Sequence, residues 1–333
     1  MSSIALTFEA FEEAEPGVAW LSLFERHWPR YREWFLSEGE GARTTYADSI
    51  RALREHMPEL VPTYEALCAL VGGGDLEARF LAMFAPPSYL SGCSQVVWRD
   101  SGTGAPILMR NYDYAPERLE GAILSTTWAG KRVIGVSDCA WGLLDGINED
   151  GLAVSLAFGG RKVVGTGFGV PLVVRYLLQT CATTDAARSV LRRLPYHLAH
   201  TLTIVDVTGD TCTAYIAPDR EVVLTEVAAA TNHQGEVEWT EHAHATFSLE
   251  REGALVGLVS GGVASQESLV HAFLTPPLYQ DGYARRMGTL YTAAYDVRRG
   301  LATYLWPGIA WEQSFAAFVP GVQSVIVESP AAA

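Results

Sequence analysis

The stretch SYLSGCSQVVWRDSG, residues 88–102, places a Gly-Cys pair directly before a short alternating run and a turn. The run predicts a strand that begins at Cys93, and the segment PILMRNYDY predicts a second strand over residues 106–113. We expect the two strands to form a hairpin, because only a turn containing Gly and Pro separates them. A structural cysteine could lie anywhere in a core, whereas the first position of a strand suits a cysteine that becomes a chain terminus.

Composition and charge narrow the classes of protein that are possible. The chain has 333 residues, 49% of them hydrophobic, which is enough to bury the core of one large or two modest domains. The formal net charge is −14 and no run is rich in Lys or Arg, so we expect neither nucleic acid nor a membrane surface as a partner. No apolar run approaches the roughly 18 residues of a spanning helix, and the first residues lack the basic segment of a signal peptide.

The cysteines show neither a CxxC motif nor a metal-ligand spacing. This pattern predicts a reduced, cytoplasmic protein without a bound metal, and we expect no cofactor. Apart from Cys93, core packing is the simplest interpretation of these residues. The five cysteines are Cys68, Cys93, Cys139, Cys181 and Cys212.

Hydrophobic periodicity divides the chain into alternating helical and strand-rich parts. Residues 18–70 have apolar positions at helical spacing, and the chain becomes strand-rich from Cys93 onward. Residues 169–194 are again helical, strands and a helix near 248–259 follow, and residues 287–307 are strand-like. This order predicts an α+β fold in which helical and sheet layers are stacked.

The predicted hairpin also gathers residues that suit a thiol nucleophile. Cys93 begins the first strand, and Arg110 and Asp113 lie at the end of the second. An arginine favours the thiolate, and a carboxylate can hold a cation or an amine in place. Successive residues of a regular strand point to opposite faces, so Arg110 and Asp113 can both serve Cys93 only if the chain bends or bulges at Asn111–Tyr112.

The base that would activate the thiol has two possible sources. One is a histidine that is distant in sequence but close in space, for which the candidates are His197, His200 and His233. The other is the α-amino group that Cys93 would gain if the Gly92–Cys93 bond were cut. Such a group has a pKa of about 7.7–8.0 and lies on the same residue as the thiol.

The segment GCSQVVWRDSGTGAPILMRNYDY resembles the Gly-Cys-(Ser/Thr)…Arg-Asn-x-Asp signature of the N-terminal-nucleophile (Ntn) cysteine hydrolases. The most similar branch is the isopenicillin-N acyltransferase-like family, which is related to choloylglycine (bile-acid) hydrolase and penicillin V acylase. The resemblance covers roughly residues 55–310. Further segments resemble family motifs in the same order: LLDGINEDGLAVSLAF, PLVVRYLLQTCATTDAARSVL, TLTIVDVTGD, AATNHQ, FSLER and GTLYTAAYDVRRG.

The resemblance implies a fold, a maturation step and an activity. The fold would be a four-layer αββα sandwich, made as a zymogen that Cys93 cuts autocatalytically between Gly92 and Cys93. Residues 1–92 would form a helical leader that becomes the α chain, and residues 93–333 the catalytic β chain, together one compact domain. The mature protein would be an amide-bond (C–N) hydrolase or an acyltransferase acting on a small-molecule acyl amide or acyl thioester.

The resemblance also assigns roles to individual residues. Cys93 would be the nucleophile, and Arg110 would set the electrostatics around the thiol. Asp113 would hold the freed α-amino group, Asn232 would donate to the oxyanion, and Arg251 matches a late family arginine.

Two features of the site stay open at the level of sequence. Where the amidase relatives place a second oxyanion asparagine, this chain has Ala157, so backbone N–H groups would have to assist. Trp141, Phe158 and His200 are candidates for the substrate pocket. Core packing is the simpler interpretation of the two aromatic residues, and a satisfied surface position that of His200.

Two rival classes remain open beside the Ntn interpretation. One is a cysteine hydrolase that uses a histidine base and is never cut, which cleavage at Gly92–Cys93 would argue against. The other is a non-catalytic protein that keeps the fold, which the intact set of Cys93, Arg110, Asp113 and Asn232 argues against. The sequence indicates no oligomeric state.

Overall fold

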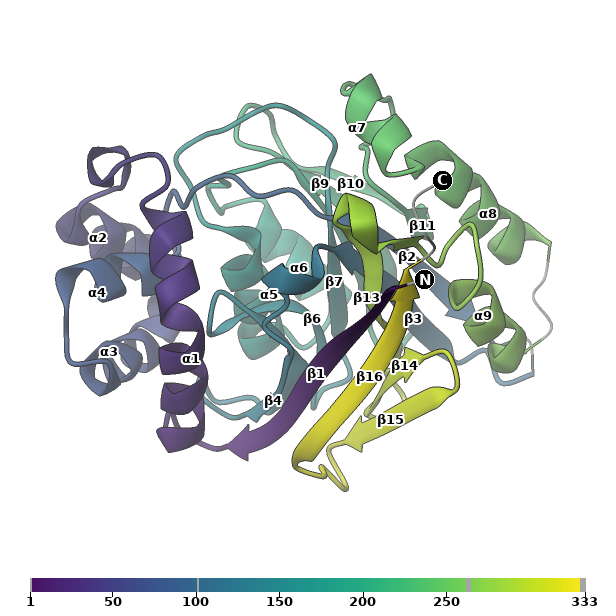
Figure 1. Cartoon of the computed structure of the whole chain (residues 1–333), viewed down its shortest axis with the longest axis horizontal. Helices are drawn as coiled ribbons and strands as arrows, with labels where there is room; N and C mark the ends of the chain where they lie inside the picture. Colours follow the sequence, from purple (N-terminus) through teal and green to yellow (C-terminus); the bar gives the residue numbers. More distant parts are fainter. Residues whose placement is uncertain (1, 101, 262–264, 330–333) are drawn as a thin grey trace.

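Two β-sheets pack face to face in the centre of the molecule (Figure 1). The computed structural model describes residues 2–100, 102–261 and 265–329. The larger sheet contains, in spatial order, β10 (Val223–Thr225), β9 (Thr211–Ile216), β8 (His200–Val205), β7 (Ala153–Phe158), β6 (Gly142–Asn148), β5 (Val133–Asp138), β4 (Ala122–Thr126), β1 (Ser2–Glu13) and β16 (Gly321–Ser329). The smaller sheet contains β11 (Ala229–Ala230), β2 (Gly92–Arg99), β3 (Pro106–Tyr114), β13 (Met287–Asp296), β14 (Leu301–Trp306) and β15 (Ile309–Ser314), with β12 (Asp281–Gly282) paired to β13.

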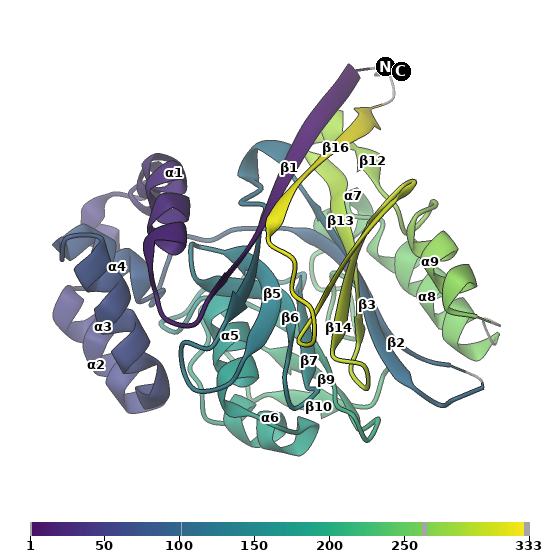
Figure 2. The ribbon, with the colours of Figure 1, turned by 90° about the horizontal axis from the view of Figure 1, so that it is seen from below.

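Helices cover the outer face of each sheet. Helix α5 packs against β5, β6 and β7 of the larger sheet, and α8 packs against β2 and β11 of the smaller one. Figure 2 shows α1–α4 on the same side of the molecule as α5 and α6, and α8 and α9 on the opposite side. The helices are α1 (Val18–Phe35), α2 (Tyr46–His56), α3 (Val61–Leu70), α4 (Asp75–Leu81), α5 (Val170–Thr180), α6 (Thr184–Leu191), α7 (Thr240–Ala245), α8 (Ser248–Ser260) and α9 (Gln266–Phe273). Short 3₁₀ turns are η1 (Glu40–Ala42), η2 (Pro58–Leu60), η3 (Pro116–Arg118) and η4 (Tyr283–Arg285).

Strand β2 shows how the sequence builds these layers. Alternate side chains of a strand point to opposite faces. Cys93 and Val97 therefore lie in the core between the sheets, while Val96 and Trp98 lie in a second core against α8 and α9. A strand covered on both faces reads as a nearly continuous buried run, which is why CSQVVW contains no exposed residue.

The predicted hairpin is present. Strands β2 and β3 pair antiparallel from Gly92↔Asp113 to Arg99↔Pro106. Residue 101 of the connecting turn lies outside the described residues. Cys93 is therefore the second residue of an inner strand.

The prediction of a purely helical leader is wrong for residues 2–13. These residues form β1, which pairs with β16 from the far end of the chain and, in parallel, with β4. The physical reason is an alternation in which Leu6, Phe8 and Ala10 are buried, so that one face of the strand covers the core. The leader thus contributes an inner strand of the larger sheet as well as helices.

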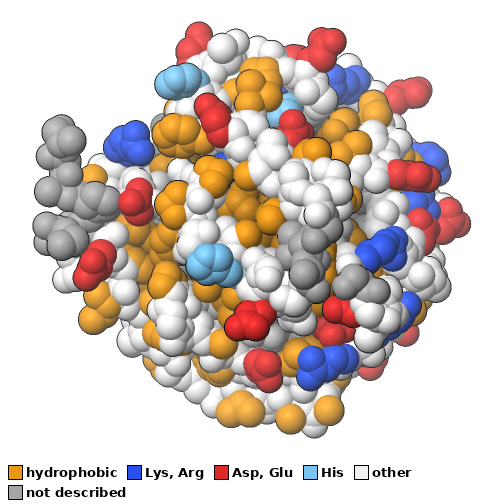
Figure 3. All heavy atoms as spheres, turned by 90° about the vertical axis from the view of Figure 1, so that its right-hand side faces the viewer, with side chains coloured by type: hydrophobic (Ala, Val, Ile, Leu, Met, Phe, Trp, Pro, Cys, Tyr) orange, Lys and Arg blue, Asp and Glu red, His pale blue; other side chains and the backbone are white. Residues whose placement is uncertain are grey.

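Two surface features complete the description. In the described ranges, no helix combines the length and the apolar character needed to cross a membrane. Figure 3 shows acidic and basic side chains interspersed with hydrophobic ones over the side that carries α8 and α9. Among the exposed hydrophobic residues of α8 are Leu249, Val256 and Val259.

Candidate active site

The thiol of Cys93 lies fully buried between the two sheets. A guanidinium nitrogen of Arg110, Nη2, donates to Sγ at 3.0 Å, and the hydroxyl of Ser91 lies 3.8 Å from the same sulfur. Burial raises the pKa of the Cys93 thiol, and the charge of Arg110 is the largest influence that opposes this rise. In the uncut chain the thiol is therefore protonated at neutral pH, with a cation already beside it.

Arg110 and Asp113 lie on opposite faces of β3. Residue 110 pairs with Gln95, so its side chain shares the face of Cys93, whereas residue 113 pairs with Gly92. The bend or bulge at Asn111–Tyr112 that would let both side chains serve Cys93 directly is absent, because the register between β2 and β3 continues without a shift. The irregularity lies instead in β13, between Thr289 and Tyr291.

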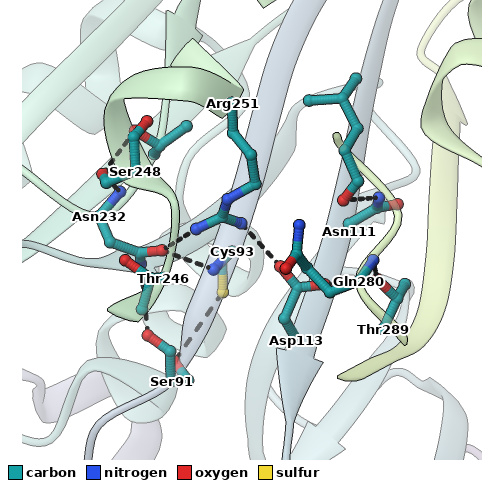
Figure 4. A network of polar contacts seen from close by, with 12 residues as sticks. Ser91, Cys93, Asn111, Asp113, Asn232, Thr246, Ser248, Arg251, Gln280 and Thr289 are labelled. Atoms are coloured by element: carbon teal, nitrogen blue, oxygen red, sulfur yellow. Dashed lines mark hydrogen bonds and ion pairs between the residues drawn. The ribbon is translucent and has the colours of Figure 1, made fainter. Parts of the chain in front are cut away.

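The backbone nitrogen of Cys93 is held from the other face of the sheet. Its N–H donates to Oδ1 of Asn232 at 3.0 Å, and Nη2 of Arg251 donates to the same oxygen at 2.6 Å. Arg251 also donates through Nη1 to Asp113 at 2.7 Å, and Thr289 donates to the second carboxylate oxygen at 2.7 Å. Figure 4 shows this chain of contacts from Cys93 to Asp113.

Asp113 therefore reaches Cys93 through two other side chains. Within the described part of the chain, no hydrogen bond joins Asp113 directly to Cys93. Asp113, Arg251 and Asn232 are buried, and a buried charge must be paired to be tolerated. The Asp113–Arg251 ion pair thus fixes the orientation of the Asn232 side chain.

The amide nitrogen of Asn232 donates hydrogen bonds close to the expected cut. Its Nδ2 donates to the carbonyl of Ser91 and to that of Phe158, both at 3.3 Å. The residue follows β11, and the hydroxyl of Ser248 accepts its backbone N–H at 2.9 Å. Ala157, the position at which the sequence resemblance implied a second oxyanion asparagine, is buried in β7 and offers no side-chain donor.

Gly92 is closely surrounded. A Cβ atom at this position would come within 2.8 Å of the Met287 sulfur and 3.2 Å of the Asp113 Cβ. A side chain here would displace groups around the expected scissile bond, so close packing accounts for the glycine.

No histidine of the described chain is hydrogen-bonded to the Cys93 sulfur. His197 bonds the carbonyl of Gly165, and His233 bonds Ser248 and Glu252. His200 packs against Tyr89 and Phe158, and burial lowers its pKa to about 3.

The three candidates for the substrate pocket lie in packed surroundings. Trp141 is fully buried and donates through its indole to the carbonyl of Leu81 at 2.8 Å. Phe158 packs against His200 and His242. A small open pocket lies elsewhere, and it is lined by Arg30, Tyr31, Trp34, Tyr89, Tyr114, Arg118, Asp138 and Cys139.

Several residues of the site were not predicted from the sequence. Thr289 and Ser91 carry no motif of their own, although Ser91 is only two residues from Cys93. Asp145 contacts Arg110 from the opposite sheet, a placement that no local pattern reveals. Among the described residues, no group of three or more His, Cys, Asp or Glu side chains is arranged to hold a metal ion.

Comparison with known proteins identifies the family of the chain. The chain belongs to the acyl-coenzyme A:6-aminopenicillanic acid acyl-transferase family, which it matches over residues 98–311. That range includes Arg110, Asp113, Asn232 and Arg251 and begins after Cys93. The stacked layers and this membership confirm the α+β Ntn-hydrolase fold class and the family that the sequence predicted.

Solved structures of Ntn hydrolases are similar to the chain at low sequence identity. A penicillin V acylase from Agrobacterium tumefaciens has a TM-score of 0.49 and 14% identity, covering 70% of this chain and 90% of its own. A Caenorhabditis elegans orthologue of N-acylethanolamine-hydrolyzing acid amidase has a TM-score of 0.46 and 15% identity, and the match covers 62% of this chain and 93% of that one. A mutant conjugated bile acid hydrolase from Clostridium perfringens has a TM-score of 0.44 and 10% identity, and the match covers 69% of this chain and 96% of that one. A search of curated protein sequences finds no match.

Proposed function

We propose that the chain is an autoproteolytically activated cysteine amidase or acyltransferase, in which Cys93 first cuts its own chain and then carries the acyl group. Family membership supports the broader class of acyl hydrolases and acyltransferases. The observation that carries the proposal of a self-cutting cysteine nucleophile is that two hydrogen bonds fix Cys93. Its sulfur accepts from Arg110, and its backbone nitrogen donates to Asn232. A thiol nucleophile and its own amino group as base need these two positions fixed independently.

The proposed maturation starts from the uncut chain. Sγ attacks the carbonyl carbon of Gly92, the C–N bond breaks, and the nitrogen of Cys93 takes the thiol proton. Water then hydrolyses the resulting thioester, which leaves a carboxylate on Gly92 and restores the thiol. The new α-amino group has a pKa of about 7.7–8.0 in the absence of other influences, and Asn232 already accepts a hydrogen bond from this nitrogen.

The same groups then serve the external substrate. The α-amino group takes the proton of the thiol, Sγ forms a thioester with the substrate acyl group, and the protonated amine returns the proton to the leaving group. Water or an amine resolves the acyl-enzyme, which gives hydrolysis or transfer. A small acyl amide or acyl thioester is the substrate class.

The aromatic cavity is the candidate site for the acyl group. Tyr114 of its wall packs against Tyr112, and the guanidinium of Arg110 lies 5.0 Å from the Tyr112 ring centre. Tyr89, also in the wall, belongs to the segment that the cut would free. Arg30, Arg118 and Asp138 also line the pocket, so an acyl group with an apolar or aromatic body and a polar end suits it.

The two pieces would stay together after the cut. Strand β1 belongs to residues 1–92, and both of its neighbours, β4 and β16, belong to residues 93–333. Separating the pieces would expose two rows of backbone hydrogen-bonding groups.

The test is to trap the acyl-enzyme. Wild-type protein incubated with a simple acyl thioester or acyl amide should gain the mass of one acyl group, located on the peptide that begins with Cys93. Hydrolysis of the same compounds with the acyl group on another residue would contradict the proposal.

Two substitutions of Asn232 distinguish the role of its N–H donor from that of its oxygen acceptor. Asn232→Ala should lower kcat by about 10²–10³, the usual effect of one oxyanion donor. Asn232→Asp keeps an oxygen for Cys93 and Arg251 but loses the N–H donor, so its kcat should fall at least as far. Steady-state kinetics on folded protein measure both variants. A change within about threefold in both would exclude Asn232 as the donor.

A further inference from the structure

A buried carboxylate from the opposite sheet forms an ion pair with the arginine that contacts the thiol. Asp145 lies in β6 of the larger sheet, whereas Arg110 lies in β3 of the smaller one, and both side chains are fully buried. Oδ2 of Asp145 accepts from Nη1 of Arg110 at 2.5 Å and from the hydroxyl of Tyr291 at 2.5 Å. The hydroxyl of Tyr295 donates to the other carboxylate oxygen.

The two ends of the Arg110 guanidinium have different partners. Nη1 donates to Asp145 and, at 3.1 Å, to the carbonyl of Leu144, so the opposite sheet holds this nitrogen twice. Nη2 donates to Cys93 Sγ. Because the guanidinium is planar and rigid, fixing Nη1 also fixes the direction of Nη2.

Arg110 depends on this single carboxylate. Asp145 is the one carboxylate within ion-pair distance of Arg110 in the described ranges of the chain. A buried cation that loses its partner is strongly destabilised and turns toward any other acceptor. The two tyrosines, both from β13, hold the carboxylate itself in place.

We propose that Asp145 is a positioning residue, which orients Arg110 so that its Nη2 points at the Cys93 sulfur. The inference rests on the proposed role of Cys93 as nucleophile, but the contact that it explains exists in the uncut chain. Asp145 acts through Arg110 and touches neither the sulfur nor the substrate.

A positioning role and a purely electrostatic role of Asp145 predict opposite shifts in the pH at which Cys93 reacts. If Asp145 acted only by its charge, removing it would favour the thiolate, and Cys93 would react at lower pH. If it positions Arg110, removing it costs the thiolate a directed hydrogen bond, and Cys93 would react at higher pH. The direction of the change therefore identifies the role.

The experiment measures the pH dependence of Cys93 alkylation by iodoacetamide, read by mass spectrometry on the peptide that contains Cys93. In Asp145→Ala the midpoint should rise by about one pH unit, which corresponds to losing part of one charge-assisted hydrogen bond. In Asp145→Asn it should lie between wild type and Asp145→Ala, because the amide oxygen can still accept from Arg110. A midpoint that falls or stays unchanged in either variant would overturn the proposal.

A matched control separates positioning from general damage to the core. Thr203 is a buried residue of β8 in the same cross-strand row, reached from Asp145 through Ser155. Thr203→Val should leave the midpoint unchanged. If Asp145→Ala does not fold, Asp145→Asn still tests the proposal. An alkylation midpoint above that of wild type supports it, and a midpoint at or below that of wild type overturns it. Should wild-type protein form no acyl-enzyme, the proposed function fails, yet the alkylation midpoints still test the positioning role.

Discussion

Cys93→Ala should remain a single chain of 333 residues and form no acyl-enzyme. Both reactions use the same sulfur, and alanine removes it while keeping the strand. The loss of turnover should be on the order of 10⁶-fold, as when the nucleophile of a covalent mechanism is removed. Intact-mass measurement and turnover of an acyl thioester record the two losses.

A second buried thiol supplies the control. Cys212 lies in β9, away from the Arg110 contact, so Cys212→Ala should be cut and acylated like wild type. A Cys93→Ala chain that is still cut after Gly92 would show that another group attacks the bond.

Asp113→Asn should reduce acyl-enzyme formation by about 10²–10³ and slow the cleavage of the chain. The change keeps the size of the side chain but leaves the buried Arg251 without its counter-ion, and breaking such a pair costs roughly 3–5 kcal/mol. Arg251 would then be held only by an uncharged acceptor and would fix Asn232, which holds the Cys93 nitrogen, less firmly. A melting curve on the same sample shows whether the fold survives.

The histidine variants distinguish this mechanism from a histidine base. His197→Ala, His200→Ala and His233→Ala should each have a mild effect, because none of these side chains contacts the sulfur in the described structure. Suppose instead that one of them abolished acyl-enzyme formation in folded, cleaved protein while Asp113→Asn stayed near wild type. That histidine would then be the base.

The hairpin and its cysteine could be predicted because their signals are local. Alternation over residues 93–99, the turn and the second strand lie within one short stretch, and the order of the motifs indicated the family. The sequence showed that Arg110 and Asp113 could both serve Cys93 directly only if the strand bent or bulged between them. The strand stays regular and presents them on two faces, so Asp113 is linked to the Cys93 nitrogen through Arg251 and Asn232.

Other parts of the site depend on contacts between distant segments. Strand β1 is stabilised by pairing with β16 at the other end of the chain. Because the short alternation near Phe8 does not reveal this distant partner, the leader was predicted to be helical. Asp145 lies in a run of apolar residues, and its role depends on how one sheet faces the other. No periodicity within β6 carries that information.

The most direct test of the account is the intact mass of purified wild-type protein under denaturing conditions. The account predicts two pieces, of 92 and 241 residues (333 − 92 = 241), with cysteine as the first residue of the larger one, and a single associated species under native conditions. Wild-type protein that remains one uncut chain and still turns over acyl amides would contradict it.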